Sequence, residues 1–287
     1  MTPTALDALG TQIDEVFFLI GVAILLIETA EVLFKGEHKG RTLAEMAVSA
    51  STQIPYLVFE VLILTGGYAI FYILAEVAQP WQIPLTWRGI ALAVVAADLT
   101  YYWEHRIAHE VRLLWTQHAV HHSSRDYNII TGIRFGPLEG VWSLIAHIPL
   151  VCLGFSPEMI FFGIITVLAY QTWIHTEVIG RLGWFDRVMN SPANHRVHHG
   201  CDDKYIDRNY GGITVIWDQL FGTYQAEEET PRYGLKRDFD SRNPVVVWFS
   251  ELPGLWRDMR HASTWDEAWR YMMRPPGWRP PSADGRE

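Results

Sequence analysis

Five apolar stretches follow one another along the N-terminal part of the chain, at residues 16–34, 54–74, 88–97, 141–155 and 159–174. A helix needs about 20 predominantly apolar residues to cross a bilayer. The first two stretches reach this length and the third nearly does. The last two are short enough for either a re-entrant hairpin or two spans. The pattern predicts an all-α, multi-pass integral membrane bundle, in which the first stretch is a retained anchor.

Basic residues predict the orientation of this bundle, because Lys and Arg concentrate in the cytoplasmic loops of membrane proteins. Lys35, Lys39 and Arg41 follow the first stretch, and a series of arginines follows the third. We therefore expect the N-terminus outside, and the 105–135 segment and the C-terminal third in the cytoplasm. Glu28, near the end of the first stretch, is expected at the membrane interface because a carboxylate inside lipid is costly.

Charge and cysteine content narrow the class of protein further. The net charge of the 287 residues is −9, which argues against a nucleic acid partner. The two cysteines, Cys152 and Cys201, make no disulfide framework and fit a reducing compartment.

Three histidine clusters share a helical spacing. His105 and His109 are four residues apart in HRIAH, whereas HAVHH and HRVHH begin at His118 and His195. Because residues three and four apart lie on one face of a helix, each cluster directs its imidazoles toward a common point. Asp98, two turns before His105, is expected on the same face. The nine candidate metal ligands are His105, His109, His118, His121, His122, His175, His195, His198 and His199.

The number of imidazoles indicates the kind of metal centre. Imidazole binds zinc, copper, iron and nickel, but a zinc site takes four ligands. Two metals sharing eight or nine histidines therefore explain the pattern best. Two redox metals beside apolar segments suit activation of O₂ against an unreactive C–H bond, which favours iron. A zinc hydrolase is a weaker alternative, because HRIAH lacks the Glu of HExxH proteases. A metal carrier is weaker too, since its ligands would follow a path through several spans.

These segments resemble the fatty acid hydroxylase (sterol desaturase) superfamily of membrane di-iron enzymes, which is defined by HxxxH, HxxHH and a later HxxHH. The resemblance extends from about Asp98 to Pro244 and includes DLTYYWEHRIAHE, LWTQHAVHHSS, YQTWIHTEVIGRLG, HRVHHG, YIDRNYGG and WDQLFGTY. The sequences of these longer motifs are most similar to the alkylglycerol monooxygenase-like branch of the superfamily. The resemblance implies that the nine histidines ligate metal and that Glu110, after His109, is important for catalysis. Asn194, often a histidine in the family, and the segment 201–203 depart from the pattern.

The resemblance implies hydroxylation, desaturation or oxidative carbon removal on lipids, sterols or carotenoids, all of which begin with hydrogen abstraction. Our hypothesis is a di-iron monooxygenase that hydroxylates an apolar, membrane-dissolved substrate, with desaturation as the alternative. We expect catalytic roles for Asp98 and Glu110, the former as a carboxylate partner of a metal-bound imidazole. The substrate is expected to reach the metals between residues 88–104 and 159–175.

Electrons must come from a donor in trans, because the chain has no GxGxxG fingerprint and no four-cysteine cluster. A ferredoxin, a cytochrome or a reduced pterin are the candidate donors. A basic rim could dock an acidic donor or bind anionic headgroups. It would consist of Arg125, Arg134, Arg181, Arg187, Lys204 and Arg208.

We expect one membrane-embedded hydroxylase domain at residues 1–244, with its catalytic core at about 98–244. Residues 245–287 are predicted to form amphipathic helices and a disordered tail from Pro275. These helices either pack against the cytoplasmic domain or lie on the membrane.

Overall fold

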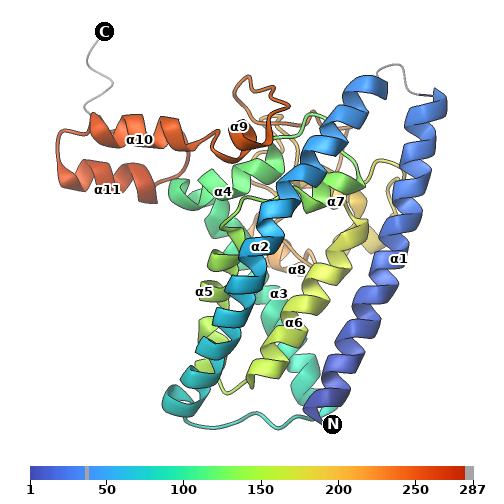
Figure 1. The fold of residues 1–287 in the computed structure, drawn as a ribbon, viewed down its shortest axis with the longest axis vertical. Helices are drawn as coiled ribbons and strands as arrows, with labels where there is room; N and C mark the ends of the chain where they lie inside the picture. The colour runs from blue at the N-terminus through green and yellow to red at the C-terminus, as the bar shows by residue number, and fades with distance from the viewer. Residues whose placement is uncertain (36–38, 282–287) are drawn as a thin grey trace.

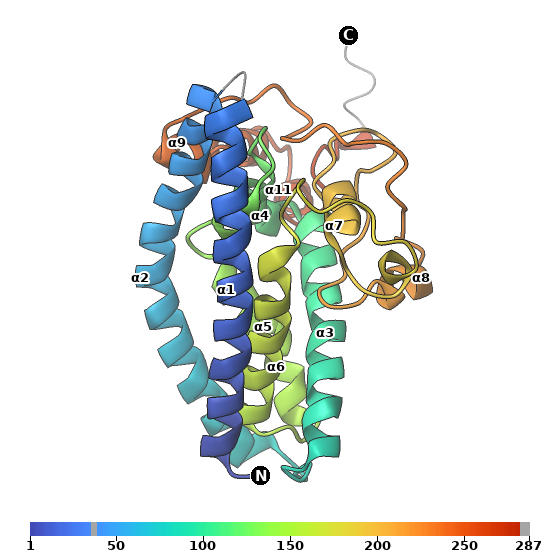
Figure 2. The same ribbon diagram turned by 90° about the vertical axis from the view of Figure 1, so that its right-hand side faces the viewer.

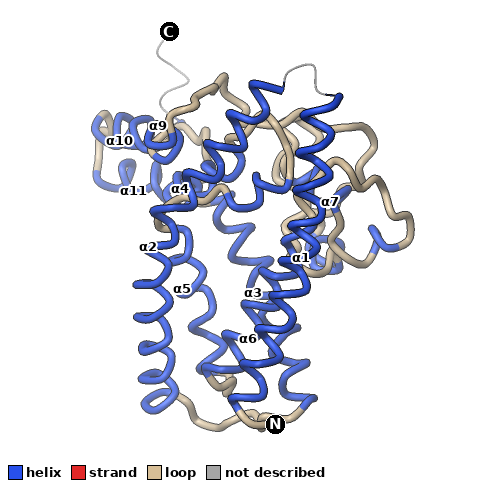
Figure 3. The backbone as a smooth tube through the Cα atoms, turned by 45° about the vertical axis from the view of Figure 1, so that its right-hand side comes forward, coloured by secondary structure: helices blue, strands red, loops and turns tan. Residues whose placement is uncertain are grey.

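A bundle of five helices forms the body of the protein in a computed structural model that describes residues 1–35 and 39–281. The helices run along the long axis of the molecule (Figure 1). They are α1 (Pro3–Lys35), α2 (Lys39–Ala78), α3 (Trp87–Glu110), α5 (Glu139–Cys152) and α6 (Pro157–Tyr170). The described chain contains helices, loops and two isolated β-bridges but no strand, which confirms the all-α prediction (Figure 3).

The hydrophobic core lies toward the end of the bundle that holds the N-terminus. Leu6 of α1, Phe71 of α2, Ile90 of α3 and Met159 of α6 are all buried in one cluster there. Gly163 permits the close packing of α6 on α3, because a Cβ at this position would lie 2.7 Å from the Cβ of Ala97.

Two helices of the described chain are long and apolar enough to cross a membrane, over Pro3–Phe34 and Val61–Ala78. Both leave large apolar side chains exposed along their length, among them Phe18 and Leu62. Helices α5 and α6, with 14 residues each, are about 21 Å long, which is shorter than a bilayer core of about 30 Å. The two short apolar stretches therefore form a helical pair within the bundle.

A cap of short helices and loops covers the opposite end of the bundle from the N-terminus (Figure 2). It contains α4 (Arg112–His122), η1 (Ile129–Ile133), η2 (Gln171–Trp173), η3 (Phe185–Arg187), α7 (Pro192–His198) and α8 (Ile216–Phe221). The C-terminal helices α9 (Pro244–Trp248), α10 (Leu252–Arg260) and α11 (Trp265–Met273) follow. Helices α10 and α11 form a hairpin that lies across the direction of the bundle (Figure 1). The end of the predicted tail, residues 282–287, lies outside the described residues.

Candidate metal centre

The nine candidate histidines meet where the cap joins the bundle, and all nine are buried. Helix α3 carries two of them, α4 carries three, and α7 with the residue after it carries three. The ninth, His175, follows η2. They form two groups in which the candidate ligand atoms lie within 4.8 Å of one another. The five-histidine group is His105, His109, His118, His122 and His198, and the four-histidine group is His121, His175, His195 and His199.

In several rings of these groups, the N–H of the outer nitrogen, Nδ1, donates a hydrogen bond to a backbone carbonyl oxygen, which can only accept. His105 Nδ1 lies 3.0 Å from the carbonyl oxygen of Tyr210, and His198 Nδ1 lies 2.9 Å from that of Arg208. His121 Nδ1 is 3.3 Å from a backbone carbonyl in the same way. Because a neutral imidazole carries one N–H, this hydrogen bond leaves the inner Nε2 of each ring as an unprotonated acceptor.

The inner nitrogens face one another at short distances. Those of His105 and His118 are 3.0 Å apart, and those of His198 and His122 are 3.1 Å apart. In the four-histidine group, Nε2 of His175 is 3.1 Å from that of His121 and 2.8 Å from that of His195. Lone pairs that converge without a proton between them repel unless a cation lies among them. Both groups therefore fit metal ions that prefer nitrogen ligands.

Burial keeps these rings in the form that binds metal. The pKa of His198 is lowered from 6.5 to about 3, mainly by burial. Burial, followed by the neighbouring imidazoles, holds the pKa of His122, His195 and His199 well below the ordinary value. At neutral pH these imidazoles are uncharged, which metal ligation requires.

The loop from Asp207 to Tyr210 shapes one side of the five-histidine group. It supplies the two carbonyl oxygens that fix His105 and His198, and Asp207 Oδ1 lies 3.4 Å from Nδ1 of His109. Asp207 and Asn209 have φ angles of 58° and 56°, a conformation that is costly for residues other than glycine. The Asn209 amide holds the turn by hydrogen bonds to the backbone of residues 194 and 225.

Glu139, the first residue of α5, provides the carboxylate beside the five-histidine group that sequence reasoning missed. Its Oε1 lies 2.5 Å from Nδ1 of His118, and its Oε2 accepts a hydrogen bond from the backbone of Gly136. A carboxylate in this position fixes the ring orientation and raises the basicity of a metal-binding imidazole. In the sequence, Glu139 was visible only as an acidic residue just before an apolar stretch. Acidic residues are common at helix N-termini, so this feature did not indicate a metal site.

The two carboxylates that the sequence favoured lie elsewhere. Asp98 accepts hydrogen bonds from the backbone N–H of Ile213 at 2.6 Å and from Trp217 Nε1 at 2.9 Å, and therefore anchors the segment before α8. Glu110 is half exposed and pairs with Arg106 at 2.8 Å. Within the described residues neither carboxylate is hydrogen-bonded to a histidine. Their catalytic roles stay predictions.

A buried ion pair supports the four-histidine group from α2. Arg134 is 1% exposed, and its guanidinium contacts Glu45 at 3.3 Å and the hydroxyl groups of Ser49 and Ser123. Its carbonyl oxygen is the acceptor for His121. Arg134 therefore does not belong to a basic rim, as the sequence suggested, but holds η1 and α4 against α2.

Other members of the predicted basic rim are paired with acids. Arg125 contacts Asp238, and Lys204 lies 3.2 Å from Glu228 and 2.9 Å from Glu229. Arg181 and Arg208 donate to backbone carbonyl oxygens instead, so a docking role for the remaining rim stays a prediction.

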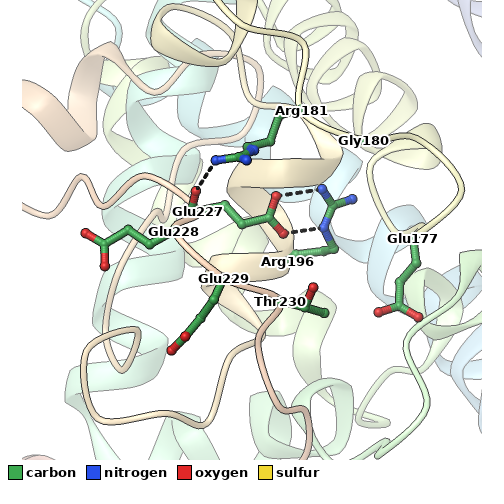
Figure 4. A pocket seen from close by; sticks show the side chains of 8 residues that line it. All are labelled: Glu177, Gly180, Arg181, Arg196, Glu227, Glu228, Glu229 and Thr230. Carbon is green, nitrogen blue, oxygen red and sulfur yellow. Dashed lines mark hydrogen bonds and ion pairs between the residues drawn. The ribbon is translucent and has the colours of Figure 1, made fainter.

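Arg196, inside the HRVHH segment, ties α7 to the segment that follows His175. Its guanidinium forms two hydrogen bonds to Glu227, at 2.6 and 2.8 Å (Figure 4). It also donates to the carbonyl oxygen of Thr176 at 2.9 Å. This pair closes one side of a polar surface pocket of about 340 Å³ that the acidic segment 227–229 lines.

Glu28 of α1 holds the same segment from the other side. Its carboxylate accepts hydrogen bonds from the hydroxyl of Thr176 at 2.5 Å and from the backbone N–H of Ile129 at 2.8 Å. The side chain is buried within the protein, and its expected depth at the membrane interface stays a prediction. Its burial is possible because two donors satisfy the carboxylate.

The positions that depart from the family pattern also have structural partners. Asn194 is buried, and its amide donates to the carbonyl oxygens of Asp186 and Met189 at 2.7 and 3.1 Å. It belongs to neither histidine group. Asp202 and Asp203 pair with Arg232 and Lys236 on the surface.

A cavity of about 540 Å³ leads from the histidines into the bundle. Four histidines from both groups, His105, His118, His121 and His175, line one end. The rest of the wall is mainly apolar and comes from α1 to α6 and η1, with Glu104 and Glu139 among its acids. Residues Phe18, Val22, Leu25, Ile133, Phe135 and Leu168 are part of the apolar wall.

The cavity touches both segments between which we expected the substrate to pass. Tyr101 and Glu104 of α3 and Leu168 of α6 lie in its wall, and closer to the N-terminus Gly163 packs against Ala97. The cavity also extends along α1 and α2, with Phe18 and Tyr56 in its wall, and the access route stays a prediction.

Comparisons with known proteins agree on one family. Residues 90–223 match the family model described as fatty acid hydroxylase. The alkylglycerol monooxygenase of Homo sapiens is 36% identical over 266 residues, which cover 92% of this chain and 59% of that protein. Ornithine lipid hydroxylase OlsE of Rhizobium tropici is 36% identical over 162 residues, covering 52% of this chain and 48% of that protein.

A sterol enzyme is a more distant relative. Delta(7)-sterol 5(6)-desaturase ERG3B of Gibberella zeae is 28% identical over 144 residues, which cover 49% of this chain and 43% of that protein. The chain spans less than two thirds of the length of each of these three relatives. No solved structure matches the chain significantly.

Proposed function

We propose, from the premise that this chain belongs to the fatty acid hydroxylase family, that it is a membrane-bound di-iron oxygenase that hydroxylates an unactivated C–H bond of an apolar lipid. The family match confirms the resemblance seen in the sequence. The observation that carries the proposal is the convergence of buried imidazole nitrogens in two adjacent groups beside a mainly apolar cavity. The named relatives include two lipid oxygenases and a sterol desaturase.

The nine histidines would hold two iron ions, one in the five-histidine group and one in the four-histidine group. Iron bound there supplies the activation of O₂ that hydrogen abstraction from an unactivated carbon requires. Glu139 and the 207–210 loop orient the imidazoles of the first group. Arg134, Arg196 and Glu28 hold the segments that carry the second. The electrons would come from a ferredoxin, a cytochrome or a reduced pterin in trans.

The apolar cavity wall would bind the substrate and exclude water from the reacting carbon. Because four histidines from the two groups line the cavity, both metals would lie near that carbon. A lipid, a sterol or a carotenoid fits the chemistry of this wall. Asp98, which holds residues 213–217, and Glu110, which pairs with Arg106, would have the catalytic roles expected from the sequence.

The apolar surfaces of α1 and α2 support a multi-pass position in a bilayer. The basic residues after the first and third apolar stretches favour a cytoplasmic position for the cap and the histidines. The cavity wall along α1 and α2 would then receive substrate from the membrane.

Desaturation is the second candidate function. It is favoured by the sterol desaturase relative, and it begins with the same hydrogen abstraction. A zinc hydrolase and a metal transporter are weaker candidates, because each leaves part of the two buried histidine groups without a role.

Metal analysis of the purified full chain tests the proposal first. We expect about two irons per chain after expression in iron-replete cells, and less iron in His121→Ala. His261→Ala is the matched control, because His261 is exposed at the end of α10 and belongs to neither group. One zinc without iron after iron reconstitution would contradict the di-iron proposal.

Product analysis tests the reaction and separates it from desaturation. Lipid and pigment extracts of cells with the wild-type chain should contain an O₂-dependent product that is absent with His121→Ala. A mass increase of one oxygen atom indicates hydroxylation, and a loss of two hydrogens indicates desaturation. If the extracts of wild-type and His121→Ala cells have the same lipid and pigment composition with every substrate supplied, the proposal of an oxygenase acting on membrane lipids is contradicted.

A further inference from the structure

Helix α11 presents a stripe of large apolar side chains to the outside. Trp265, Trp269 and Met273 follow one another at intervals of four residues and are 93%, 57% and 39% exposed. Residues four apart lie on one side of a helix, so the three side chains form one continuous line. Nothing in the described chain covers this line, which we call the α11 stripe.

The two other sides of α11 have different surroundings. Tyr271 is buried and its ring lies 5.3 Å from that of Trp278. Asp266 and Arg270 form an exposed ion pair at 2.7 Å. At about 100° per residue, the helix has a sector facing the protein, a polar sector and the apolar α11 stripe between them. A helix that rests on protein with one side and in a membrane surface with another has this pattern.

The hairpin is fixed to the cap, so the direction of the stripe is defined by the fold. The backbone N–H of Arg112, at the start of α4, donates to the carbonyl oxygen of Arg274 at 3.1 Å. The side chain of Arg112 contacts Asp258 of α10 at 2.7 Å. The hairpin is therefore tied to α4, which carries His118, His121 and His122, through α10 and through the residue after α11.

The orientation of the hairpin suits a membrane surface. Helices α10 and α11 lie across the long helices, and α11 is the one nearer to the part of the bundle that runs toward the N-terminus (Figure 1). The long helices expose apolar side chains along that part, among them Leu62 and Ile73 of α2. A bilayer around these helices would have its surface parallel to α11.

We propose that α11 lies in the headgroup region of the phospholipid bilayer and inserts the α11 stripe toward the acyl chains. Tryptophan favours this depth, because its ring is apolar and its N–H is polar. Arg270 and Arg274, both exposed, would contact lipid phosphates. The stripe is one side chain wide and rich in tryptophan, which fits a lipid surface better than a protein groove. This inference rests on the proposed membrane position of α1 and α2.

The anchored hairpin gives α4 a defined height above the membrane. Because α4 supplies His118, His121 and His122, the helix would place the metal groups at the depth where the cavity meets lipid. Membrane contact would thus position the site.

Spin-label accessibility in vesicles tests the proposal on the full chain. Single cysteines replace Trp269, Asp266 and Leu62 in turn, in a Cys152→Ser, Cys201→Ser background, and each carries a nitroxide. The protein is reconstituted in vesicles of phosphatidylcholine and phosphatidylglycerol. Collisions with O₂, which concentrates in the bilayer, are compared with collisions with a water-soluble nickel chelate. Trp269→Cys should favour O₂ several-fold over Asp266→Cys, which is the matched control on the polar side of the same helix.

Three other results of the accessibility measurement would overturn the proposal, each for a different reason. The label at 269 could collide with the nickel chelate as often as the label at 266, while the label at 62 collides only with O₂. In that case the α11 proposal fails, but the membrane position of the bundle stands. If Leu62→Cys also meets the nickel chelate, the membrane position itself fails. If the label at 269 is shielded from both reagents, a protein partner or a second copy covers the stripe, and the lipid proposal is overturned. Unchanged iron content shows that each variant is folded.

Discussion

At the scale of single residues, the candidate metal centre depends on side chains that aim the imidazoles. Carbonyl oxygens and the Glu139 carboxylate accept the outer N–H groups, so that the inner nitrogens converge. The two groups differ in this respect. The five-histidine group has carboxylates at both His118 and His109, whereas Nδ1 of His175 and of His195 has no hydrogen-bond partner in the described chain. The first group is thus more firmly oriented by the protein.

Glu139→Leu removes the acceptor for His118, and we expect the affinity for one iron to fall about 10–100-fold, as is typical when such a supporting contact to a metal ligand is lost. Glu139→Gln, which keeps an acceptor oxygen, should lose less. Competition with a coloured iron chelator measures the affinity. Glu158→Gln is the control, because Glu158 contacts Tyr72 at the other end of the bundle. Equal affinities for wild type and Glu139→Leu would show that Glu139 does not support a metal ligand.

Gly132→Ala tests the close approach of η1 to the four-histidine group. A Cβ at residue 132 would lie 2.9 Å from Nδ1 of His175, so this ring must move. We expect iron to be lost from the four-histidine group, as measured by iron per folded chain. Gly40→Ala is the control, because nothing lies within 4 Å of a Cβ at that position. Full iron content in Gly132→Ala would mean that the His175 ring can shift without loss of the site.

At the scale of elements, buried charges connect α1 and α2 to the segments that carry the histidines. Arg134 and Glu45 join η1 to α2, and Glu28 joins α1 to the backbone of η1 and to Thr176. The apolar faces of these helices align them in the bundle. The polar contacts define their position relative to the cap.

Glu45→Gln leaves the buried guanidinium of Arg134 without its counter-charge. Removing one charge of a buried ion pair lowers the free energy of unfolding by about 3–5 kcal/mol. Denaturant titration in detergent, followed by tryptophan fluorescence, measures this change. The exposed pair on α11 is the control, and Asp266→Asn should cost no more than about 0.5 kcal/mol. A loss below about 1 kcal/mol for Glu45→Gln would show that Ser49 and water compensate the charge.

At the scale of the whole molecule, the metal centre joins the bundle to the cap, because its ligands come from α3, α4, α7 and the segment after η2. A ligand that binds only the folded chain raises its stability by mass action. Metal bound by all four segments would therefore stabilise the entire protein.

Removal of the metal should lower the melting temperature of the full chain. The chelated protein is expected to regain its melting temperature with Fe²⁺ but not with Mg²⁺, which prefers oxygen ligands. Differential scanning fluorimetry in detergent measures the shift. His261→Ala should behave as wild type. A melting temperature that does not change on chelation would contradict a shared metal centre.

The sequence by itself determined the helical segments and the identity of the candidate ligands. Both depend on local periodicity: apolar runs of helical length produced the long helices, and spacings of three and four residues placed histidines on one side of α3, α4 and α7. The histidine motifs also indicated the family, which the comparisons confirm.

Only the tertiary structure decided how the histidines divide into two groups and which carboxylates support them. Glu139 is 21 residues from His118, and Asp207 lies far along the chain from His109, so no local spacing relates them. The same holds for the burial of Arg134 and Glu28, which depends on partners in other helices, and for the cavity, which is lined by side chains from several helices. Contacts between distant segments are set by how helices pack, and that information is spread over the whole chain.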